Sequence, residues 1–346
     1  MEEFDINNFE VHQAKIMTVG TGGGGCNTVN RLTTMGILGA KTIAANTDAR
    51  HLAMVKAHKK ILLGRQLTRG LGAGGYPDVG KQAAIEAKTE MREALQGCDL
   101  LFLTCGLGGG TGTGSAPVVA SIAKEMGSIV IAAVTLPFRI EGARVGKAED
   151  GLGKLRETCD TVIAIENQKL LQIAGNKPLN EAFAVADNLI ATMIKGISET
   201  ISQPSLVNLD YADVKTIMKA GGVATVGIGE SNTKNRAEDA ITQALNNPLL
   251  DVDYQDATGA LIQVIGGEDL KLEEINLIGE AVSKNMSPDA MVMWGARILP
   301  DMAGKVQVIT IITGVKSPYI TGISEKTVNE KRASRVLTNE LGIKVI

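Results

Sequence analysis

A segment rich in glycine and threonine has the residue types needed to bind a phosphate group. It follows the apolar run 100–105 and precedes a helix-like stretch that begins at Ser115. Glycine lacks the Cβ atom that would keep an anion away from backbone N–H groups, and the start of a helix adds a favourable dipole. Two threonine hydroxyls add further donors. We therefore predict a phosphate-binding loop rather than a flexible linker, formed by Gly108, Gly109, Gly110, Thr111, Gly112, Thr113 and Gly114.

Two further glycine clusters also follow predicted strands. The ligand-contacting residues expected in the first are Gly22, Gly23, Gly24, Gly25, Cys26 and Asn27. Those expected in the second are Gly72, Ala73 and Gly74, and Asn46 ends the strand between the two clusters. The carboxyl ends of parallel strands meet at one edge of a sheet, so the three clusters should converge there. Such convergence favours a polyphosphate nucleotide over a single pyrophosphate.

The first cluster also matches a known nucleotide motif. The pattern Gly-x-Gly-x-x-Gly at 20–25 is the dinucleotide fingerprint, which leaves an NAD-dependent oxidoreductase open as an alternative. That fingerprint expects a carboxylate about 20 residues later, where Asp48 could serve. The chain has no Walker motif and no lysine within the glycine clusters. Backbone amides, helix dipoles and a magnesium ion would therefore balance the phosphate charge, with no side chain assigned as a metal ligand.

An alternation of apolar strands and helix-like segments positions these clusters. Six strands are predicted at 16–19, 42–46, 61–63, 100–105, 129–135 and 162–166. The helices between them are predicted at 27–35, 81–96, 115–126 and 147–158. This βαβ pattern indicates a parallel sheet covered by helices on both faces.

A long helix with a broad apolar stripe, at 180–203, is predicted to join this unit to a second one. Strands of the second unit are predicted near 223–229, 260–266, 290–298 and 305–313, and its helices near 211–219, 236–246 and 271–284. The expected division is a flexible segment at 1–14, a nucleotide-binding domain at 15–179, the central helix, a C-terminal α/β domain at 204–317, and a linker and tail at 318–346.

The composition fits a two-domain globular protein. The 346 residues are 44% hydrophobic, and a net charge of −3 argues against nucleic acid as a partner. The acidic start does not resemble a signal peptide, and no run of 18 apolar residues could span a membrane. The four cysteines lack CxxC or zinc spacing, so we expect buried, reduced thiols in a cytoplasmic protein. They are Cys26, Cys98, Cys105 and Cys159.

The loops at 20–27 and 108–114, together with Asn-Leu-Asp-Tyr-Ala-Asp at 208–213, resemble the FtsZ/tubulin family of GTPases, and FtsZ in particular. The resemblance covers about residues 15–317. It implies a Rossmann-like parallel-sheet GTPase domain joined by a long central helix to a smaller α/β domain. It also implies GTP and GDP as ligands, magnesium, and self-assembly into head-to-tail filaments for cell division at mid-cell.

The same resemblance assigns residues to the nucleotide. It places Asp187 and Asn167 on the guanine edge, Phe183 against the face of the base, and Asn27 near the base or ribose. A carboxylate can accept hydrogen bonds from guanine N1–H and N2–H₂ together, which adenine does not offer. From the residues alone, Asp187 could instead be a helix-surface carboxylate and Phe183 a core aromatic.

Two positions near the ribose and phosphates depart from the family pattern. The resemblance places Glu141 and Arg144 there, but the spacing from Glu141 to Gly151 is one residue shorter than in many bacterial relatives. Cys26 stands where relatives usually have glycine. A small side chain fits at that position, and the backbone there should have a negative φ.

The acidic residues of the segment 206–213 have two compatible interpretations. Asp210 as N-cap and Asp213 at the third helical position are close to a capping box. The resemblance implies that this loop enters the nucleotide pocket of the next subunit, where Asp210 and Asp213, with Asn208, orient or activate the attacking water. A head-to-tail contact that does not close produces a filament.

The chain ends in a charged stretch at 318–338 and an apolar end at 341–346. The resemblance implies a short peptide that docks on a membrane-tethering division protein. A frayed terminus, or a segment packed on the second domain, is the alternative. A tubulin-family scaffold for cell shape rather than division also remains open at this point.

Overall fold

The computed structural model describes residues 14–315, except 204, 208, 220–221, 247–253, 255–256 and 285. The predicted flexible segment at 1–14 lies outside the described residues except for its last residue. The linker and tail at 318–346 and the candidate catalytic residue Asn208 lie outside them as well. The predictions for them therefore stay predictions.

The first sheet has six parallel strands in the order β3-β2-β1-β4-β5-β6. These strands are β1 (Ile16–Thr21), β2 (Ala40–Asn46), β3 (Lys59–Leu62), β4 (Leu100–Gly106), β5 (Ile129–Leu136) and β6 (Thr161–Glu166). The helices between them are α1 (Gly22–Met35), α2 (Ala49–Met54), α3 (Pro77–Glu86), α4 (Lys88–Ala94), α5 (Thr111–Glu125) and α6 (Ala143–Thr158). All six strands and the predicted parallel arrangement are confirmed.

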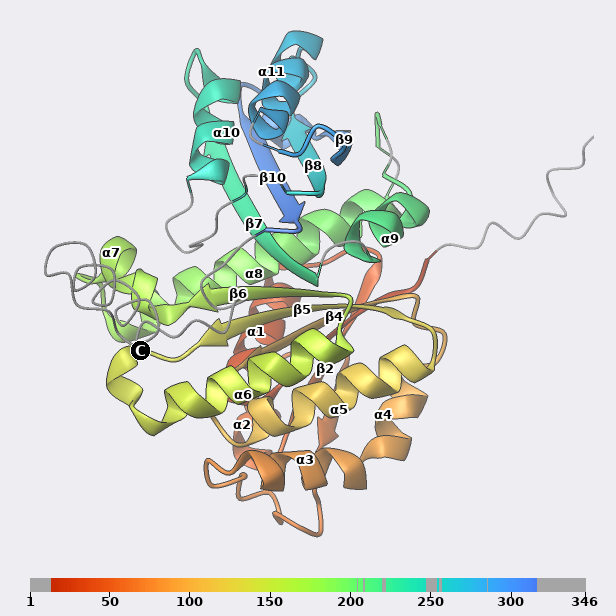
Figure 1. Ribbon diagram of the computed structural model, residues 1–346, viewed down its shortest axis with the longest axis vertical. Helices are drawn as coiled ribbons and strands as arrows, with labels where there is room; N and C mark the ends of the chain where they lie inside the picture. Colours follow the sequence, from red (N-terminus) through yellow and green to blue (C-terminus); the bar gives the residue numbers. More distant parts are fainter. Residues whose placement is uncertain are drawn as a thin grey trace, which may run out of the picture.

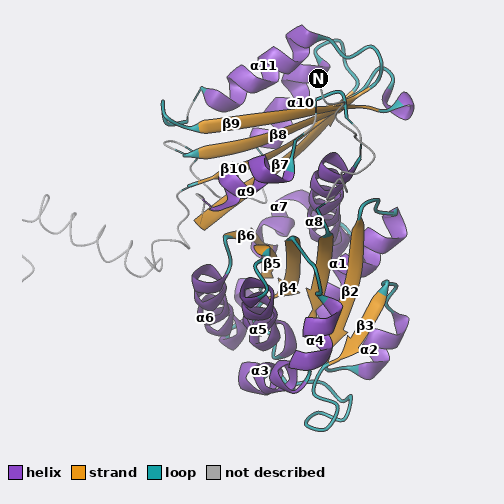
Figure 2. Cartoon of the chain, turned by 90° about the vertical axis from the view of Figure 1, so that its right-hand side faces the viewer, coloured by secondary structure: helices purple, strands orange, loops and turns teal. Residues whose placement is uncertain are grey.

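Helices cover both faces of this sheet (Figure 2). One face packs against α1 and the long helix α8 through residues that include Leu32 and Ile190. The other face packs against α3, α5 and α6 through residues that include Val119 and Leu155. Because both faces are buried, the strands are apolar along their whole length rather than alternating.

The predicted helix bounds were wrong at four places, one of which is α6, which begins at Ala143 rather than 147. α1 begins at Gly22 rather than 27, and α5 begins at Thr111 rather than 115, because each strand passes almost directly into its helix. All of the predicted residues at 22–27, and the second half of the cluster at 108–114, are therefore helical rather than part of a loop. The predicted helix 81–96 begins earlier, at Pro77, and is divided into α3 and α4 at Ala87.

The central helix α8 (Leu179–Ser202) follows η3 (Asn167–Lys169) and α7 (Leu170–Ala174). Its 24 residues give it a length of about 36 Å. The predicted apolar stripe is buried, with Met193, Ile194 and Ile197 no more than 1% exposed. Figure 1 shows α7 and α9 at opposite ends of this helix.

The second unit carries four strands in the order β7-β10-β8-β9. Its elements are α9 (Tyr211–Lys219), β7 (Gly222–Ser231), α10 (Arg236–Leu245), β8 (Gly259–Gly266), α11 (Leu272–Ser283), β9 (Met291–Ile298) and β10 (Val306–Thr313). β10 runs antiparallel to β7 and β8, and β9 runs parallel to β8. A short parallel contact between β6 and β7 joins the two sheets edge to edge. The sequence predicted only the helix as a connection.

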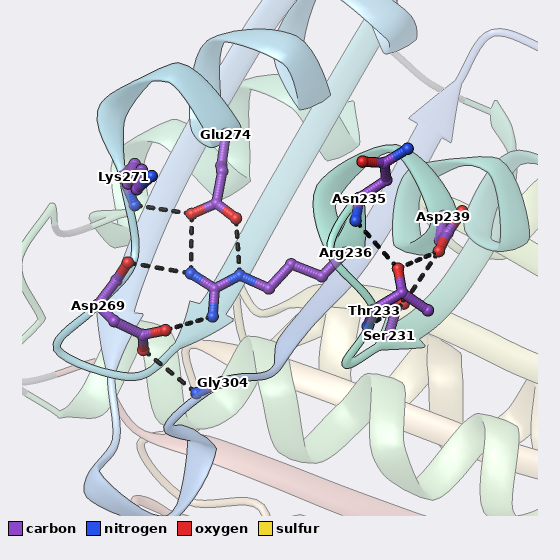
Figure 3. Close-up of polar contacts among 9 residues, drawn as sticks. All are labelled: Ser231, Thr233, Asn235, Arg236, Asp239, Asp269, Lys271, Glu274 and Gly304. Atoms are coloured by element: carbon purple, nitrogen blue, oxygen red, sulfur yellow. Dashed lines mark hydrogen bonds and ion pairs between the residues drawn. The ribbon is translucent and has the colours of Figure 1, made fainter.

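A buried arginine holds the outer part of this unit together (Figure 3). Arg236, the first residue of α10, donates Nε to Glu274 at 2.7 Å and Nη2 to the other oxygen at 2.9 Å. Its Nη1 pairs with Asp269, which also accepts the Gly304 N–H at 3.3 Å. These hydrogen bonds lower the pKa of both carboxyls and raise that of the guanidinium. One residue thus fixes α10, α11 and the turn before β10.

Candidate functional site

The three glycine clusters lie together at the carboxyl edge of the first sheet. A Cβ atom at Gly22 would lie 2.7 Å from the Gly112 nitrogen, so these two segments touch through their backbones. A Cβ at Gly110 would lie 2.9 Å from the Cβ of Ala73, which brings in the third cluster. Larger residues at these positions would separate the segments. The predicted convergence is therefore observed.

Open space remains where a ligand would need it. No atom lies within 4 Å of the Cβ position at Gly23, Gly72 or Gly109, one from each cluster. At the starts of α1 and α5, Thr21 and Gly110 make no side-chain cap hydrogen bond. The first N–H groups of both helices are thus left without a capping side chain and can donate to an anion.

Some of the predicted ligand residues are needed for close packing between secondary-structure elements. A Cβ at Gly25 would lie 2.2 Å from the Thr104 carbonyl oxygen, so this glycine lets α1 approach β4. A Cβ at Gly114 would lie 1.9 Å from the Pro77 carbonyl oxygen, so that glycine lets α5 approach α3. The Thr113 hydroxyl accepts the Gly108 N–H at 2.9 Å and shapes the loop.

The Cys26 side chain points away from the open space. Its Sγ lies 3.6 Å from the Ala45 carbonyl oxygen, and burial raises the pKa of the thiol to about 12. Only its backbone could contact a ligand, and its φ is not positive, as predicted. All four cysteines are buried and unpaired. Among the described residues, no cluster of three His, Cys, Asp or Glu side chains could hold a metal ion.

Asn27 and Asn46 are linked by a histidine that the sequence analysis did not single out. Asn46 Nδ2 lies 3.1 Å from His51 Nδ1, and His51 Nε2 lies 3.0 Å from Asn27 Oδ1. His51 lacks any metal-ligand spacing. It lies in the first turn of α2, shortly after the end of β2 and the predicted site residue Asn46. That position was the signal available in the sequence.

Asp187 lies on α8 where this helix packs against α1. Its Oδ1 accepts the Thr28 hydroxyl at 2.8 Å, and the neighbouring Asn188 accepts a hydrogen bond from Arg31. Burial raises the pKa of the Asp187 carboxyl to about 6, against the opposing effects of Thr28 and Arg31. Asp187 is therefore a desolvated carboxylate rather than an ordinary helix-surface acid.

Asn167 and Phe183 lie beyond the end of β6 and near the start of α8. The Asn167 side chain is buried, and its Oδ1 has no hydrogen-bond partner among the described residues. A buried polar atom without a partner is costly, so this oxygen is free to accept a hydrogen bond from a ligand or a water molecule. Phe183 is 38% exposed and meets Phe138 edge-on at 5.8 Å between ring centroids. Its exposure does not fit a core aromatic.

Glu141 and Arg144 form an ion pair at the edge of the glycine loop. Glu141 accepts the Phe138 N–H at 2.9 Å with one oxygen and the Arg144 guanidinium at 2.7 Å with the other. A Cβ at Gly108 would lie 2.9 Å from the Arg144 carbonyl oxygen. The shorter spacing to Gly151 therefore still leaves Arg144 beside the loop.

A lysine on α6, also not singled out from the sequence, fastens the third glycine cluster. Lys147 Nζ donates to the Gly75 carbonyl oxygen at 2.8 Å. The same ammonium lies 5.6 Å from the centroid of the Tyr76 ring, within the range of a cation–π contact.

The acidic pair lies at the opposite edge of the sheet. Asp213 N–H donates to Asp210 at 2.9 Å, and Asp210 N–H donates to Asp213 at 3.4 Å, which confirms the predicted capping. The Tyr211 hydroxyl donates to the Asp99 carbonyl at 3.0 Å, immediately before β4. The phosphate-binding loop follows the far end of β4, about 23 Å away. Within one chain, these acids and that loop cannot meet.

Family models match both halves of the chain. Residues 15–175 match the Tubulin/FtsZ family, GTPase domain, and residues 222–316 match the FtsZ family, C-terminal domain. The chain is 56% identical over 320 residues to cell division protein FtsZ 2 of Methanocaldococcus jannaschii, which covers 92% of this chain and 84% of that relative. The chain belongs to the FtsZ family. Cell division protein FtsZ 1 of Thermococcus kodakarensis is 54% identical, covering 91% and 84%.

Solved structures agree with this membership in the FtsZ family. An empty FtsZ dimer from M. jannaschii superposes with a TM-score of 0.84 and 51% identity, covering 88% of this chain and 89% of that one. A GTPγS-bound protofilament of CetZ2 from Haloferax volcanii has a TM-score of 0.77 at 22% identity, covering 92% and 99%, and so shares the fold. The predicted fold class is confirmed. An oxidoreductase is not favoured by any of these matches.

Proposed function

We propose that this FtsZ family protein binds GTP and GDP at the converging glycine clusters. The open positions at Gly23, Gly72 and Gly109 support a phosphate cradle, because they lie in the three converging clusters and leave room for an anion beside the backbone. The other predicted backbone contacts come from Gly22, Gly24, Gly74, Gly110, Thr111 and Gly112. A magnesium ion, held by phosphates and water, would balance part of the charge.

We infer that the nucleotide is recognised as guanine by Asp187 and Asn167. The orphaned Asn167 amide oxygen supports this, because guanine carries N–H donors that could satisfy it. The Asp187 carboxylate, ionised at neutral pH, would accept from N1–H and N2–H₂ together. The exposed ring of Phe183 is proposed to lie against the face of the base.

The observation that carries the proposed hydrolysis is the placement of Asp210 and Asp213 at the far edge of the sheet. Because they cannot reach the glycine loop of their own chain, we propose that they act on the nucleotide of the next subunit. They would orient and deprotonate the attacking water, together with Asn208. A positioned base of this kind contributes about 10²–10⁴ in rate.

This arrangement requires head-to-tail assembly, since one end of a subunit binds the nucleotide and the other end supplies the acids. An open head-to-tail contact produces a filament. We propose that such filaments act in cell division, because the relatives at 50–56% identity are cell division proteins. Within the described residues, no helix is long and apolar enough to cross a membrane. We propose a cytoplasmic location at mid-cell, with the tail at 318–346 docking on a membrane-tethering partner.

We also infer that the domain division predicted from the sequence, at 15–179 and 204–317, separates the nucleotide-binding unit from the C-terminal unit. The two family models, which end at 175 and begin at 222, support this division.

Sedimentation combined with phosphate release tests the proposal. The protein should pellet with GTP but not with GDP or without nucleotide. Turnover per subunit should rise from near zero once the protein concentration exceeds a critical value, because only assembled joints are active. Turnover that is independent of protein concentration would contradict hydrolysis between subunits. A role in cell shape rather than division predicts filaments that localise away from mid-cell.

A further inference from the structure

His51 lies between two asparagines that the proposed function places at the nucleotide. Asn46 comes from the end of β2, His51 from the first turn of α2, and Asn27 from α1. The imidazole is thus the only described link between the amide groups of these two asparagines, at 3.1 Å and 3.0 Å. None of the roles assigned above uses this histidine.

The hydrogen bonds determine which nitrogen of His51 carries the proton. Asn46 Oδ1 accepts the Asp48 N–H at 3.3 Å, so the amide nitrogen of Asn46 faces the imidazole. That nitrogen can only donate, and therefore His51 Nδ1 must accept. His51 Nε2 then carries the hydrogen and donates to Asn27 Oδ1 at 3.0 Å. This hydrogen-bond pattern requires the tautomer with the proton on Nε2.

The backbone of His51 is fixed independently of this ring. Asp48 is the N-cap of α2, and its Oδ1 accepts the N–H groups of Arg50 at 2.9 Å and His51 at 3.0 Å. The carboxylate that the dinucleotide fingerprint would use for a ribose is therefore engaged as a helix cap. Since the cap sets the start of α2, it also sets where the imidazole can reach.

The ring determines how Asn27 presents its amide. With Oδ1 held by His51 Nε2–H, the Asn27 NH₂ group points away from the ring, and this residue is exposed. Without the ring, the amide could turn over and present oxygen instead of nitrogen. His51 therefore selects a donor, rather than an acceptor, at this position.

We propose that His51 is a positioning residue for the guanine nucleotide, which orients Asn27 to donate to an acceptor atom of the ribose or base. The inference rests on the proposed nucleotide site. The side chain of His51 contacts Asn27 and Asn46, so in this proposal it acts on binding, through Asn27, and not on the chemical step.

Two substitutions test the hydrogen bonds of the two ring nitrogens separately. A glutamine side chain can place an NH₂ group where His51 Nε2 lies, so His51→Gln keeps the donor to Asn27. An asparagine side chain can place an oxygen where Nδ1 lies, so His51→Asn keeps only the acceptor for Asn46. His51→Ala removes both. His58→Ala is a matched control, since His58 contacts Thr42 in the first half of β2, away from the glycine clusters.

The measurement is the Kd for GDP and GTP, by displacement of a fluorescent GDP analogue, together with kcat at saturating GTP. His51→Ala should raise both Kd values about tenfold, the effect of losing about one hydrogen bond. His51→Gln should restore most of the affinity, whereas His51→Asn should bind as weakly as His51→Ala. The control His58→Ala should bind like the wild type. The kcat per assembled subunit should stay within about twofold in every variant.

Unchanged Kd values in His51→Ala would overturn the inference, and so would a fall in kcat at constant Kd. Rescue by His51→Asn but not by His51→Gln would overturn the assignment to Asn27. If His51→Ala does not fold, the comparison of the Gln and Asn variants still decides the matter. A wild-type protein that binds no guanine nucleotide would contradict the proposed function and this inference together. If the wild-type protein binds guanine nucleotides and the His51 variants bind them equally well, only the inference is contradicted.

Discussion

Replacing Asp187 with asparagine should stabilise the nucleotide-free protein while weakening its binding of guanine nucleotides. Burial raises the pKa of the Asp187 carboxyl from 3.8 to about 6. Folding therefore favours the protonated form, and this contribution to stability is lost as the pH rises through about 6. In Asp187→Asn, the amide oxygen can still accept the Thr28 hydroxyl, but no charge has to be buried.

The size of the effect follows from the two pKa values. A displacement from 3.8 to about 6 corresponds to about 3 kcal/mol, so Asp187→Asn should raise the free energy of unfolding by about that amount at pH 8. At pH 5, where the folded carboxyl is mostly protonated, the gain should fall to about half. The affinity for guanine nucleotides should fall about 10- to 100-fold, because a charged acceptor is lost.

Denaturant unfolding without nucleotide, at pH 5 and pH 8, measures the first effect. Asp301→Asn, at an exposed position, serves as the control and should change stability little at either pH. Competition between GTP and ATP for the site measures the second effect. A stability gain that is equal at the two pH values, or a loss of stability, would refute the reasoning from burial. Unaltered selectivity for guanine would refute the proposed recognition.

Three further changes test other parts of the account. Asp213→Ala should retain GTP binding and sedimentation but lower phosphate release about 10²–10⁴-fold, measured per pelleted subunit. Lys147→Met should weaken GTP binding severalfold in a fluorescence titration, because the Gly75 carbonyl loses its charged donor. Glu199→Gln should lower the free energy of unfolding in denaturant by about 3–5 kcal/mol, because it leaves the Arg297 guanidinium, whose side chain is only 13% exposed, without its carboxylate at 2.6 Å.

Two of these changes have a matched control. Lys154→Met alters an exposed lysine further along α6 and should leave the affinity for GTP unchanged. Glu93→Gln alters an exposed glutamate and should change stability by less than about 0.5 kcal/mol. If Lys154→Met weakens binding as much as Lys147→Met, the Gly75 contact is not responsible. If Glu199→Gln behaves like Glu93→Gln, the ion pair with Arg297 is not a major contributor. Full turnover in Asp213→Ala would remove this acid from the chemistry.

Much of the fold was predictable because the periodicity of hydrophobic residues and the positions of glycines reflect local structure. The strands of the first sheet are uninterrupted apolar runs, and the central helix carries an apolar stripe, so each could be recognised by itself. The helix starts were misplaced because glycines such as Gly22 and Gly24 usually indicate a loop. Here they form the first turn, where a helix must pass close to a neighbouring strand: a Cβ at Gly24 would lie 3.1 Å from the Gly106 nitrogen.

The site was predictable where backbone requirements left a pattern, as in the three glycine clusters. Lys147 left no such pattern, because it acts through one long side chain that reaches Gly75, 72 residues away in sequence. His51 left only its position shortly after the end of β2. The β6–β7 contact was not predictable for a similar reason, since only Thr161 and Val162 pair with the second sheet. Long-range contacts of this kind depend on tertiary placement and not on local propensity.

Mixing two inactive variants tests the shared active site most directly. Asp213→Ala keeps the nucleotide pocket but lacks an acid. Gly23→Phe keeps the acids but fills the cradle, since the space beside the Cβ position of Gly23 is open to a side chain. Each variant alone should release almost no phosphate. In an equimolar mixture, about a quarter of the joints would combine an intact pocket with intact acids.

Phosphate release by that mixture should therefore recover to about a quarter of the wild-type value at the same total concentration. The recovery should appear only above the concentration at which the mixture sediments. A mixture no more active than the sum of its parts, although it co-sediments, would show that the acids and the nucleotide do not meet across a subunit joint.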